Sequence, residues 1–135
     1  MYVKEEMAVL LFAKSIELFE NLCQYEFDYN YYDLHNDYDC ESVTLKDDIL
    51  FINFKQEANG NSLSLIFTDV ELKQFEFFNV NDSKTLTIDN VYRGRVEIDG
   101  ELEECLGEKG YFYLEFYEGQ RLEFWAKSVG IKEKK

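Results

Sequence analysis

A chain of 135 residues has the length of one domain and can bury a hydrophobic core without disulfides or a structural metal. Its 28 acidic and 14 basic residues give a net charge of −14 at pH 7, which argues against nucleic acid and anionic membranes as partners because both would repel it. Aromatic residues make up 17% of the chain, a share that favours strands over helices.

The N-terminal segment combines an apolar run with charged neighbours. The run from Met7 to Ala13 is too short to span a bilayer, and no basic leader precedes it, so we expect neither a secretory signal nor a membrane anchor. Apolar residues between Met7 and Phe19 fit helical spacing in part, with charged residues between them. This spacing predicts one helix over about residues 5–20.

The next segment, residues 23–31, alternates between apolar or aromatic side chains and polar ones, the period of a half-buried strand. The polar residues that follow, 32–37, indicate a loop. We therefore interpret residues 23–31 as an extended segment at the edge of a sheet.

From residue 39 to residue 131 short apolar alternations end at regular intervals in turn-forming residues, a pattern typical of a β-sandwich or barrel. Turns are expected at Asp47-Asp48, Asn59–Asn61, Asp99-Gly100 and Glu118-Gly119, the last as a two-residue hairpin loop. They separate about eight strands, which must be antiparallel because a parallel crossover needs about a dozen residues. Two segments that are apolar on both faces, residues 49–52 and 111–114, are expected to be central strands.

These patterns predict a single domain over residues 1–135, with a helix near the N-terminus and a β-domain over residues 39–131. The fold class is mainly β (α+β): a meander-rich antiparallel sandwich or barrel with one N-terminal helix. No proline and no low-complexity linker marks a point where a second domain could begin. Sandwich and barrel, and the order of the strands, stay open at this point.

Groups able to perform catalysis are few. The only histidine, His35, lies between Asp33 and Asp37, where a carboxylate could raise its pKa and where Cys23 or Cys40 could approach it. The simpler interpretation is a loop residue that bonds a backbone group, and a third is direct contact with a partner. No nucleophile elbow, phosphate-binding loop or metalloprotease motif occurs. We therefore predict a protein that is not an enzyme and needs no cofactor.

One acidic window superficially has the spacing of a calcium-binding loop. Asp37, Asp39, Glu41 and Asp48 occupy positions 1, 3, 5 and 12 of a twelve-residue window. Position 6 of such a loop requires glycine for its sharp turn, and here it is Ser42. We predict no metal site.

The three cysteines, Cys23, Cys40 and Cys105, are odd in number and lack the close spacing of zinc ligands. They predict free thiols rather than a disulfide framework. Free thiols in turn predict a reducing, cytoplasmic environment.

Acidic residues and tyrosines are interleaved between Tyr25 and Asp48. Tyrosine offers rigid contact area with a polar tip, and carboxylates accept two hydrogen bonds from arginine and steer a basic partner. The predicted partner-binding residues are Tyr29, Tyr31, Tyr32, Asp33, His35, Asp37, Tyr38, Asp39 and Glu41. A second acidic concentration runs from Glu97 to Glu118. The alternative is that both are solvated faces and that the tyrosines belong to the core.

Four segments follow one another in a recognisable order: Leu34–Asp37, Ile49–Phe54, Leu65–Val70 with Phe75 after it, and Leu122–Val129. Over residues 34–131 this order resembles small bacterial immunity proteins encoded beside polymorphic toxins. The resemblance implies a cytoplasmic protein without activity of its own that binds and neutralises a cognate toxin domain. Acidity suits a basic nuclease toxin, because carboxylates can occupy a phosphate-binding surface.

Two other classes of binding or structural protein compete with this interpretation. A β-barrel could hold an apolar small ligand among its phenylalanines: Phe51, Phe67, Phe112 and Phe116. A structural module could self-associate through an apolar patch or a strand edge, and the pattern assigns no oligomeric state.

Overall fold

The computed structural model describes residues 7–27, 29–76 and 86–134. Strands dominate, with a single 3-10 turn and a one-turn α-helix among the described residues. In chain order the elements are β1 (Met7–Phe12), η1 (Ala13–Ser15), β2 (Gln24–Phe27), β3 (Asn30–Asp33), α1 (Leu34–Asp37), β4 (Tyr38–Lys46), β5 (Ile49–Gln56), β6 (Ser62–Thr68), β7 (Glu71–Glu76), β8 (Ile88–Gly94), β9 (Val96–Ile98), β10 (Glu101–Glu103), β11 (Cys105–Leu106), β12 (Lys109–Phe116), β13 (Arg121–Ala126) and β14 (Ser128–Lys134).

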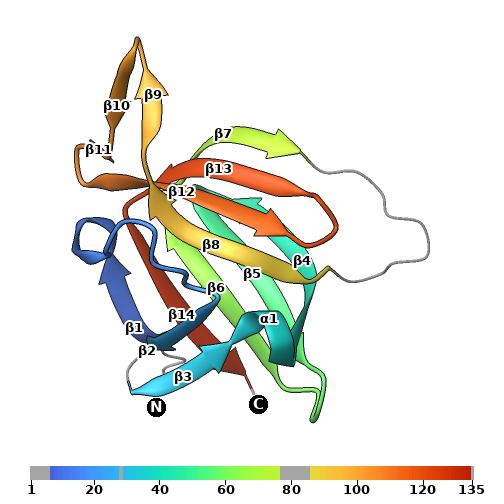
Figure 1. Ribbon diagram of the computed structural model, residues 1–135. Coiled ribbons are helices and arrows are strands. Elements are labelled where there is room, and N and C mark those ends of the chain that lie inside the picture. Colours follow the sequence, from blue (N-terminus) through green and yellow to red (C-terminus); the bar gives the residue numbers. More distant parts are fainter. Residues whose placement is uncertain (1–6, 28, 77–85, 135) are drawn as a thin grey trace.

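The strands form two larger sheets and two separate hairpins, and every pairing among the described residues is antiparallel. The first sheet has the order β1-β14-β6-β5-β4, and the second has the order β11-β12-β13-β7 with β8 also paired to β12. Figure 1 shows the two sheets as layers, with the β2–β3 hairpin and α1 at one end and the β9–β10 hairpin projecting from the other. The predicted mainly β, antiparallel, sandwich-like fold is confirmed.

Aromatic rings fill the space between the two layers. Phe67 of β6 packs edge-to-face against Phe112 of β12 and Phe124 of β13, with ring centroids 5.2 Å and 4.8 Å away. All three side chains are fully buried, in one core cluster that extends from Ala13 to Ile131. Edge-to-face rings add about 0.5–1.5 kcal/mol each to the hydrophobic gain of their burial. Phe67 and Phe112 therefore pack against each other within the core.

The helix predicted over residues 5–20 is wrong for the part of the chain that the structure describes. Residues from Met7 to Phe12 form β1, which pairs with β14. Within β1, Leu10 and Phe12 are 43% and 52% exposed while Leu11 packs against the core, an alternation with the period of a strand. Here, backbone pairing with a strand more than 110 positions away in the sequence outweighs a weak helical pattern. The spacing of apolar residues within the segment cannot reveal such a distant pairing.

Residues 23–37 also differ from the prediction. Instead of one edge strand and a loop, the structure has the β2–β3 hairpin followed directly by α1. Tyr29 makes the reversal possible because its backbone is left-handed, with φ of 66°. Asp33 then begins α1 as its N-cap, since its side chain accepts a hydrogen bond from the Asn36 amide.

The turns follow the sequence closely. Asp47-Asp48 and Asp99-Gly100 each form two-residue hairpin loops in which both residues have positive φ. The loop between β12 and β13 is one residue longer than predicted, because the Phe116 amide donates to the Gln120 carbonyl across three loop residues. The structure has more than the predicted eight or so strands because it contains short strands such as β9 (three residues), β10 (three residues) and β11 (two residues), which are too short to show an alternation in the sequence. No helix in the described ranges has the length and apolar character to cross a membrane.

Candidate functional site

A polar hollow lies where β3 and α1 meet the ends of β4, β5 and β14, and it brings together five of the nine predicted partner-binding residues. Its volume is about 350 Å³. The residues that line it are Asn30, Tyr31, Tyr32, Asp33, Asp37, Tyr38, Gln56, Asn61 and Glu133. We call this set the acidic hollow, because three carboxylates and no lysine or arginine belong to it.

The alternation of β3 decides which of its tyrosines can meet a partner. Tyr31 is exposed, whereas the neighbouring Tyr32 is buried and donates a hydrogen bond of 2.8 Å from its hydroxyl to Oε2 of Glu133. This bond ties β3 to the last strand, β14, and holds the Glu133 carboxylate in the hollow. Tyr31 is therefore the ring of β3 that is available for contact.

Tyr38 begins β4 at the floor of the hollow. Its ring packs edge-to-face against Phe54, with centroids 6.3 Å apart, and its side chain is nearly buried. Burial raises the pKa of Tyr38, and the negative charges of Glu133 and Asp37 raise it further. The Tyr38 hydroxyl therefore stays protonated. The same negative charges would favour a positively charged group in the hollow.

Asp33 has a structural task besides its place in the hollow. Its carboxylate accepts hydrogen bonds from the backbone amide and side chain of Asn36, at 3.0 Å and 2.8 Å, and a longer one from Gln24. Burial alone would raise the pKa of Asp33, but these hydrogen bonds outweigh it and lower the pKa below its ordinary value. Asp33 is therefore an anion that organises α1 and adds its charge to the hollow.

Asp37 joins the acidic hollow to a second, neighbouring depression. This second one, of about 320 Å³, is lined by Asn36, Asp37, Gln56, Glu57 and Ala58. The Glu57 amide donates to the Asp37 carbonyl at 3.2 Å, which fixes the β5–β6 loop beside α1. Among the described residues, no lysine or arginine forms an ion pair with Asp37, Glu57 or Glu133. The two depressions share Asp37 and Gln56 and form one groove, in which these three carboxylates have no lysine or arginine partner within that part of the chain.

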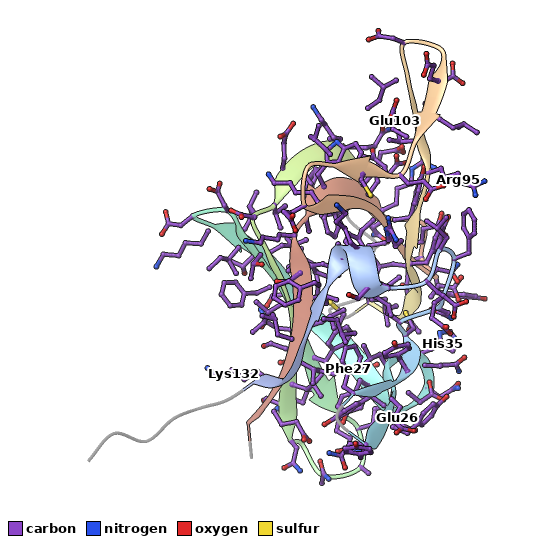
Figure 2. All side chains as sticks on the ribbon, turned by 90° about the vertical axis from the view of Figure 1, so that its left-hand side faces the viewer. Glu26, Phe27, His35, Arg95, Glu103 and Lys132 are labelled. Carbon is purple, nitrogen blue, oxygen red and sulfur yellow. The ribbon has the colours of Figure 1, made fainter. Side chains whose placement is uncertain are left out.

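The other four predicted residues lie elsewhere. Tyr29 is 91% exposed at the tip of the β2–β3 hairpin. His35 turns towards β8, where its Nδ1 donates a hydrogen bond of 2.7 Å to the Ile88 carbonyl and lies 3.8 Å from Oδ1 of Asp89. This hydrogen bond is of the kind that the simpler interpretation expected, and Figure 2 labels His35.

Asp39 and Glu41 lie further along β4. Asp39 is opposite Lys55 of β5 in the sheet register. Glu41 belongs to a different hollow of about 240 Å³ on the first sheet, together with Asn53, Ser64 and Lys132. The structure therefore separates these two carboxylates from the acidic hollow.

The two cysteines that were considered as catalytic partners, Cys23 and Cys40, are both buried. Burial raises the pKa of Cys23 well above its ordinary range and raises that of Cys40 to about 12. A thiol that stays protonated at neutral pH is a poor nucleophile. Within the described residues no group of three or more histidine, cysteine, aspartate or glutamate side chains could hold a metal ion.

Glu133 is the carboxylate of the hollow that sequence reasoning missed. In β14, Val129, Ile131 and Glu133 follow one another at every second position and face Phe67, Leu65 and Leu63 of β6. Glu133 continues this row at the end of the strand but is itself exposed, and its carboxylate accepts a hydrogen bond from Tyr32, whose buried hydroxyl needs a polar partner. The alternation of residues 129–133 is the feature of the sequence from which the position of Glu133 could have been predicted.

Only the first part of the second acidic concentration, Glu97 to Glu103, lies on a separate feature at the opposite end of the molecule, whereas Glu115 lies on β12 and Glu118 in the loop that follows it. Between β8 and β11 the chain leaves the second sheet as the β9–β10 hairpin, which we call the arm (Val96–Glu103). Figure 2 shows Glu103 on the arm and Arg95 closer to its base. There, Nε of Arg95 pairs with Glu104 at 3.0 Å, and the Tyr113 hydroxyl donates to the Arg95 carbonyl at 2.5 Å. These contacts hold the base of the arm against β12.

No protein-family model, no curated protein and no solved structure matches this chain. The geometry and charge of the acidic hollow are therefore the basis for assigning a function.

Proposed function

We propose that this chain is a non-catalytic binding protein that takes basic side chains of a protein partner in the acidic hollow. The partner in this proposal is a cognate, basic toxin domain, which the chain would neutralise as an immunity protein. The observation that carries the proposal is the groove in which Asp37, Glu57 and Glu133 have no lysine or arginine partner among the described residues.

The residues of the hollow suit an arginine or lysine in three respects. Its volume of about 350 Å³ is within the range of roughly 300–1,000 Å³ that is common for ligand sites. Its carboxylates can accept charge-assisted hydrogen bonds, about twice as strong as neutral ones. Tyr31, exposed at the rim, offers a ring face to a guanidinium or ammonium group.

Long-range charge supports the same partner. A net charge of −14 would draw a basic protein towards this chain, and carboxylates on the partner's phosphate-binding surface would compete with its substrate. We place the protein, as part of this proposal, in the reducing cytoplasm, where its three free cysteines would stay unpaired.

Binding to the product of the adjacent open reading frame tests the proposal. We expect wild-type affinity to fall as NaCl rises from 50 to 500 mM. Reversing two charges with Asp37→Lys and Glu57→Lys should weaken binding at least about tenfold, since the substituted side chains repel a basic partner. Isothermal titration calorimetry on both forms measures the change.

The matched control reverses two exposed carboxylates on the arm, Glu97→Lys and Glu101→Lys, with the same change in net charge. This variant should lose less than about threefold in affinity, the share due to long-range steering. Equal losses of affinity in the two double variants would mean that the acidic hollow is not the binding site. Absence of binding at both salt concentrations would reject this partner.

A further inference from the structure

The three cysteines differ in access and surroundings. Cys23 and Cys40 are buried in the core, whereas Cys105 is partly exposed on β11, where the chain returns from the arm to the second sheet. Only Cys105 is therefore placed to meet a reagent from solvent. Exposure alone does not make a thiol reactive, and the decisive feature is the side chain beside it.

That side chain is Arg93 of β8, which is only 7% exposed. Its Nη2 donates to Sγ of Cys105 at 3.1 Å and to the Glu104 carbonyl at 3.4 Å, and its Nη1 donates to the Ile16 carbonyl at 2.9 Å. Its Nε is buried and, within the described residues, has no hydrogen-bond partner. Nη2 is therefore the atom directed at the sulfur, while Nε lies beside Gly110 of β12.

Arg93 also lacks a carboxylate to balance its charge. No described aspartate or glutamate lies within ion-pair distance of it, and the nearby Glu104 carboxylate is held by Arg95 instead. An uncompensated buried charge costs several kcal/mol, and an anion placed next to it would offset part of that cost. In this position the atom that can become that anion is Sγ of Cys105.

The backbone opposite Cys105 is shaped around the guanidinium. Gly110 pairs with Cys105 across β11 and β12. A Cβ atom at Gly110 would lie 2.9 Å from Nε of Arg93 and 3.1 Å from Cβ of Ala13, too close for either neighbour. Glycine at this position gives Arg93 the room to reach the thiol.

We propose that Cys105 is a site of reversible thiol–disulfide exchange with low-molecular-weight disulfides, and that Arg93 stabilises its thiolate. The thiol first releases its proton to solvent. The thiolate then attacks one sulfur of the small disulfide, so that a bond from Cys105 to that sulfur forms while the original S–S bond breaks. The second sulfur leaves as a thiolate with the bonding electron pair, and excess small thiol reverses the reaction.

Intact-mass analysis of the folded protein after reaction with glutathione disulfide, or with an aromatic disulfide that releases a coloured thiolate, tests this site. We expect one adduct per chain, located at Cys105 by peptide mapping and absent from Cys105→Ser. At pH 7 Cys105 should react at least about fivefold faster in the folded chain than in the urea-unfolded chain. This comparison needs no substitution and so does not depend on a variant that folds.

Two arginine variants then assign the cause. Arg93→Gln should slow the reaction of the folded protein at least about fivefold, since it removes the charge at the sulfur. Arg95→Gln is the matched control near the same base and should change the rate less than about twofold, with circular dichroism reporting the fold of both. An adduct at Cys23 or Cys40, a folded rate no higher than the unfolded one, or equal slowing by both variants would overturn the proposal.

Discussion

Cys23 and Cys40 keep their protons in the folded chain at pH values where an unfolded chain would lose them. Burial raises the pKa of Cys40 from its ordinary value of 9.0 to about 12, and that of Cys23 further. Because the folded pKa is raised, the stability of the fold is complete below about pH 9 and declines as the pH rises above it. At pH 10 each buried thiol should cost about 1.4 kcal/mol of unfolding free energy. Urea titrations at pH 7 and pH 10 measure this loss.

The control for this pH dependence removes the two thiols. A Cys23→Ala, Cys40→Ala protein should be less stable at pH 7, because both side chains are buried, but should lose less stability between pH 7 and pH 10. The remaining decline comes from the four tyrosines whose pKa values burial also raises: Tyr38, Tyr92, Tyr111 and Tyr113. A wild-type protein equally stable at both pH values would contradict the explanation.

Among individual residues, those that line the acidic hollow could be predicted from the sequence only in part. Tyr31, Asp33 and Asp37, which the interleaving of acids and tyrosines grouped together, line the same hollow. The interleaving did not indicate that His35 turns to the Ile88 carbonyl, because the direction of a side chain on a one-turn helix depends on contacts with a distant strand. Tertiary contacts of this kind leave no periodic trace in the sequence.

Among the elements, the β4–β5 hairpin offers a direct test of turn chemistry. Asp47 and Asp48 form its two-residue loop with φ of 50° and 66°, a conformation that aspartate tolerates and that Asn-Gly prefers. Replacing the pair by Asn-Gly should raise the free energy of unfolding by about 1 kcal/mol, because it relieves backbone strain and the repulsion of adjacent carboxylates. The midpoint of urea unfolding measures the gain.

The arm carries the matched control for that substitution. Its loop, Asp99-Gly100, has the same two-residue geometry, so that Asp99→Asn creates the same Asn-Gly loop there. A hairpin outside both sheets contributes little to global unfolding, and we expect no shift in its midpoint. Equal shifts from both substitutions would contradict the local explanation.

The contrast between turns and pairings explains which elements the sequence reveals. Turns at Asp47-Asp48 and Asp99-Gly100 were predictable because the residues that permit positive φ are local and few. The strand at Met7–Phe12 was not, since its partner β14 lies at the other end of the chain. Its three last residues alternate in exposure, but alternation over three positions is too short to outweigh a helical pattern.

The whole molecule carries far more negative charge than its ion pairs can balance. The described ion pairs between acidic residues and lysine or arginine lie on the surface: Glu71 with Lys73, Glu76 with Arg121, and Glu104 with Arg95. Exposed pairs contribute roughly 0–1 kcal/mol each, whereas a net charge of −14 repels itself throughout the folded state. Salt should therefore stabilise this protein.

We expect the melting temperature at pH 7 to rise by a few degrees, roughly 2–6 °C, as NaCl increases from 20 to 500 mM. Differential scanning calorimetry measures the shift. Choline chloride is the control, since it screens equally well but does not occupy cation sites as sodium does. A melting temperature that falls with salt would mean that ion pairs, and not repulsion, dominate the surface.

The pairing of β1 with β14 also determines how the sandwich responds to mechanical force. Met7 lies opposite Lys132, and the outer ends of both strands point the same way along one ladder (Figure 1). Tension applied between these two ends would open the ladder like a zip, one pair of hydrogen bonds after another, instead of shearing all of them at once. Under load, β1 would therefore peel away first and uncover Leu11 at the core while the remaining strands of the first sheet were still paired.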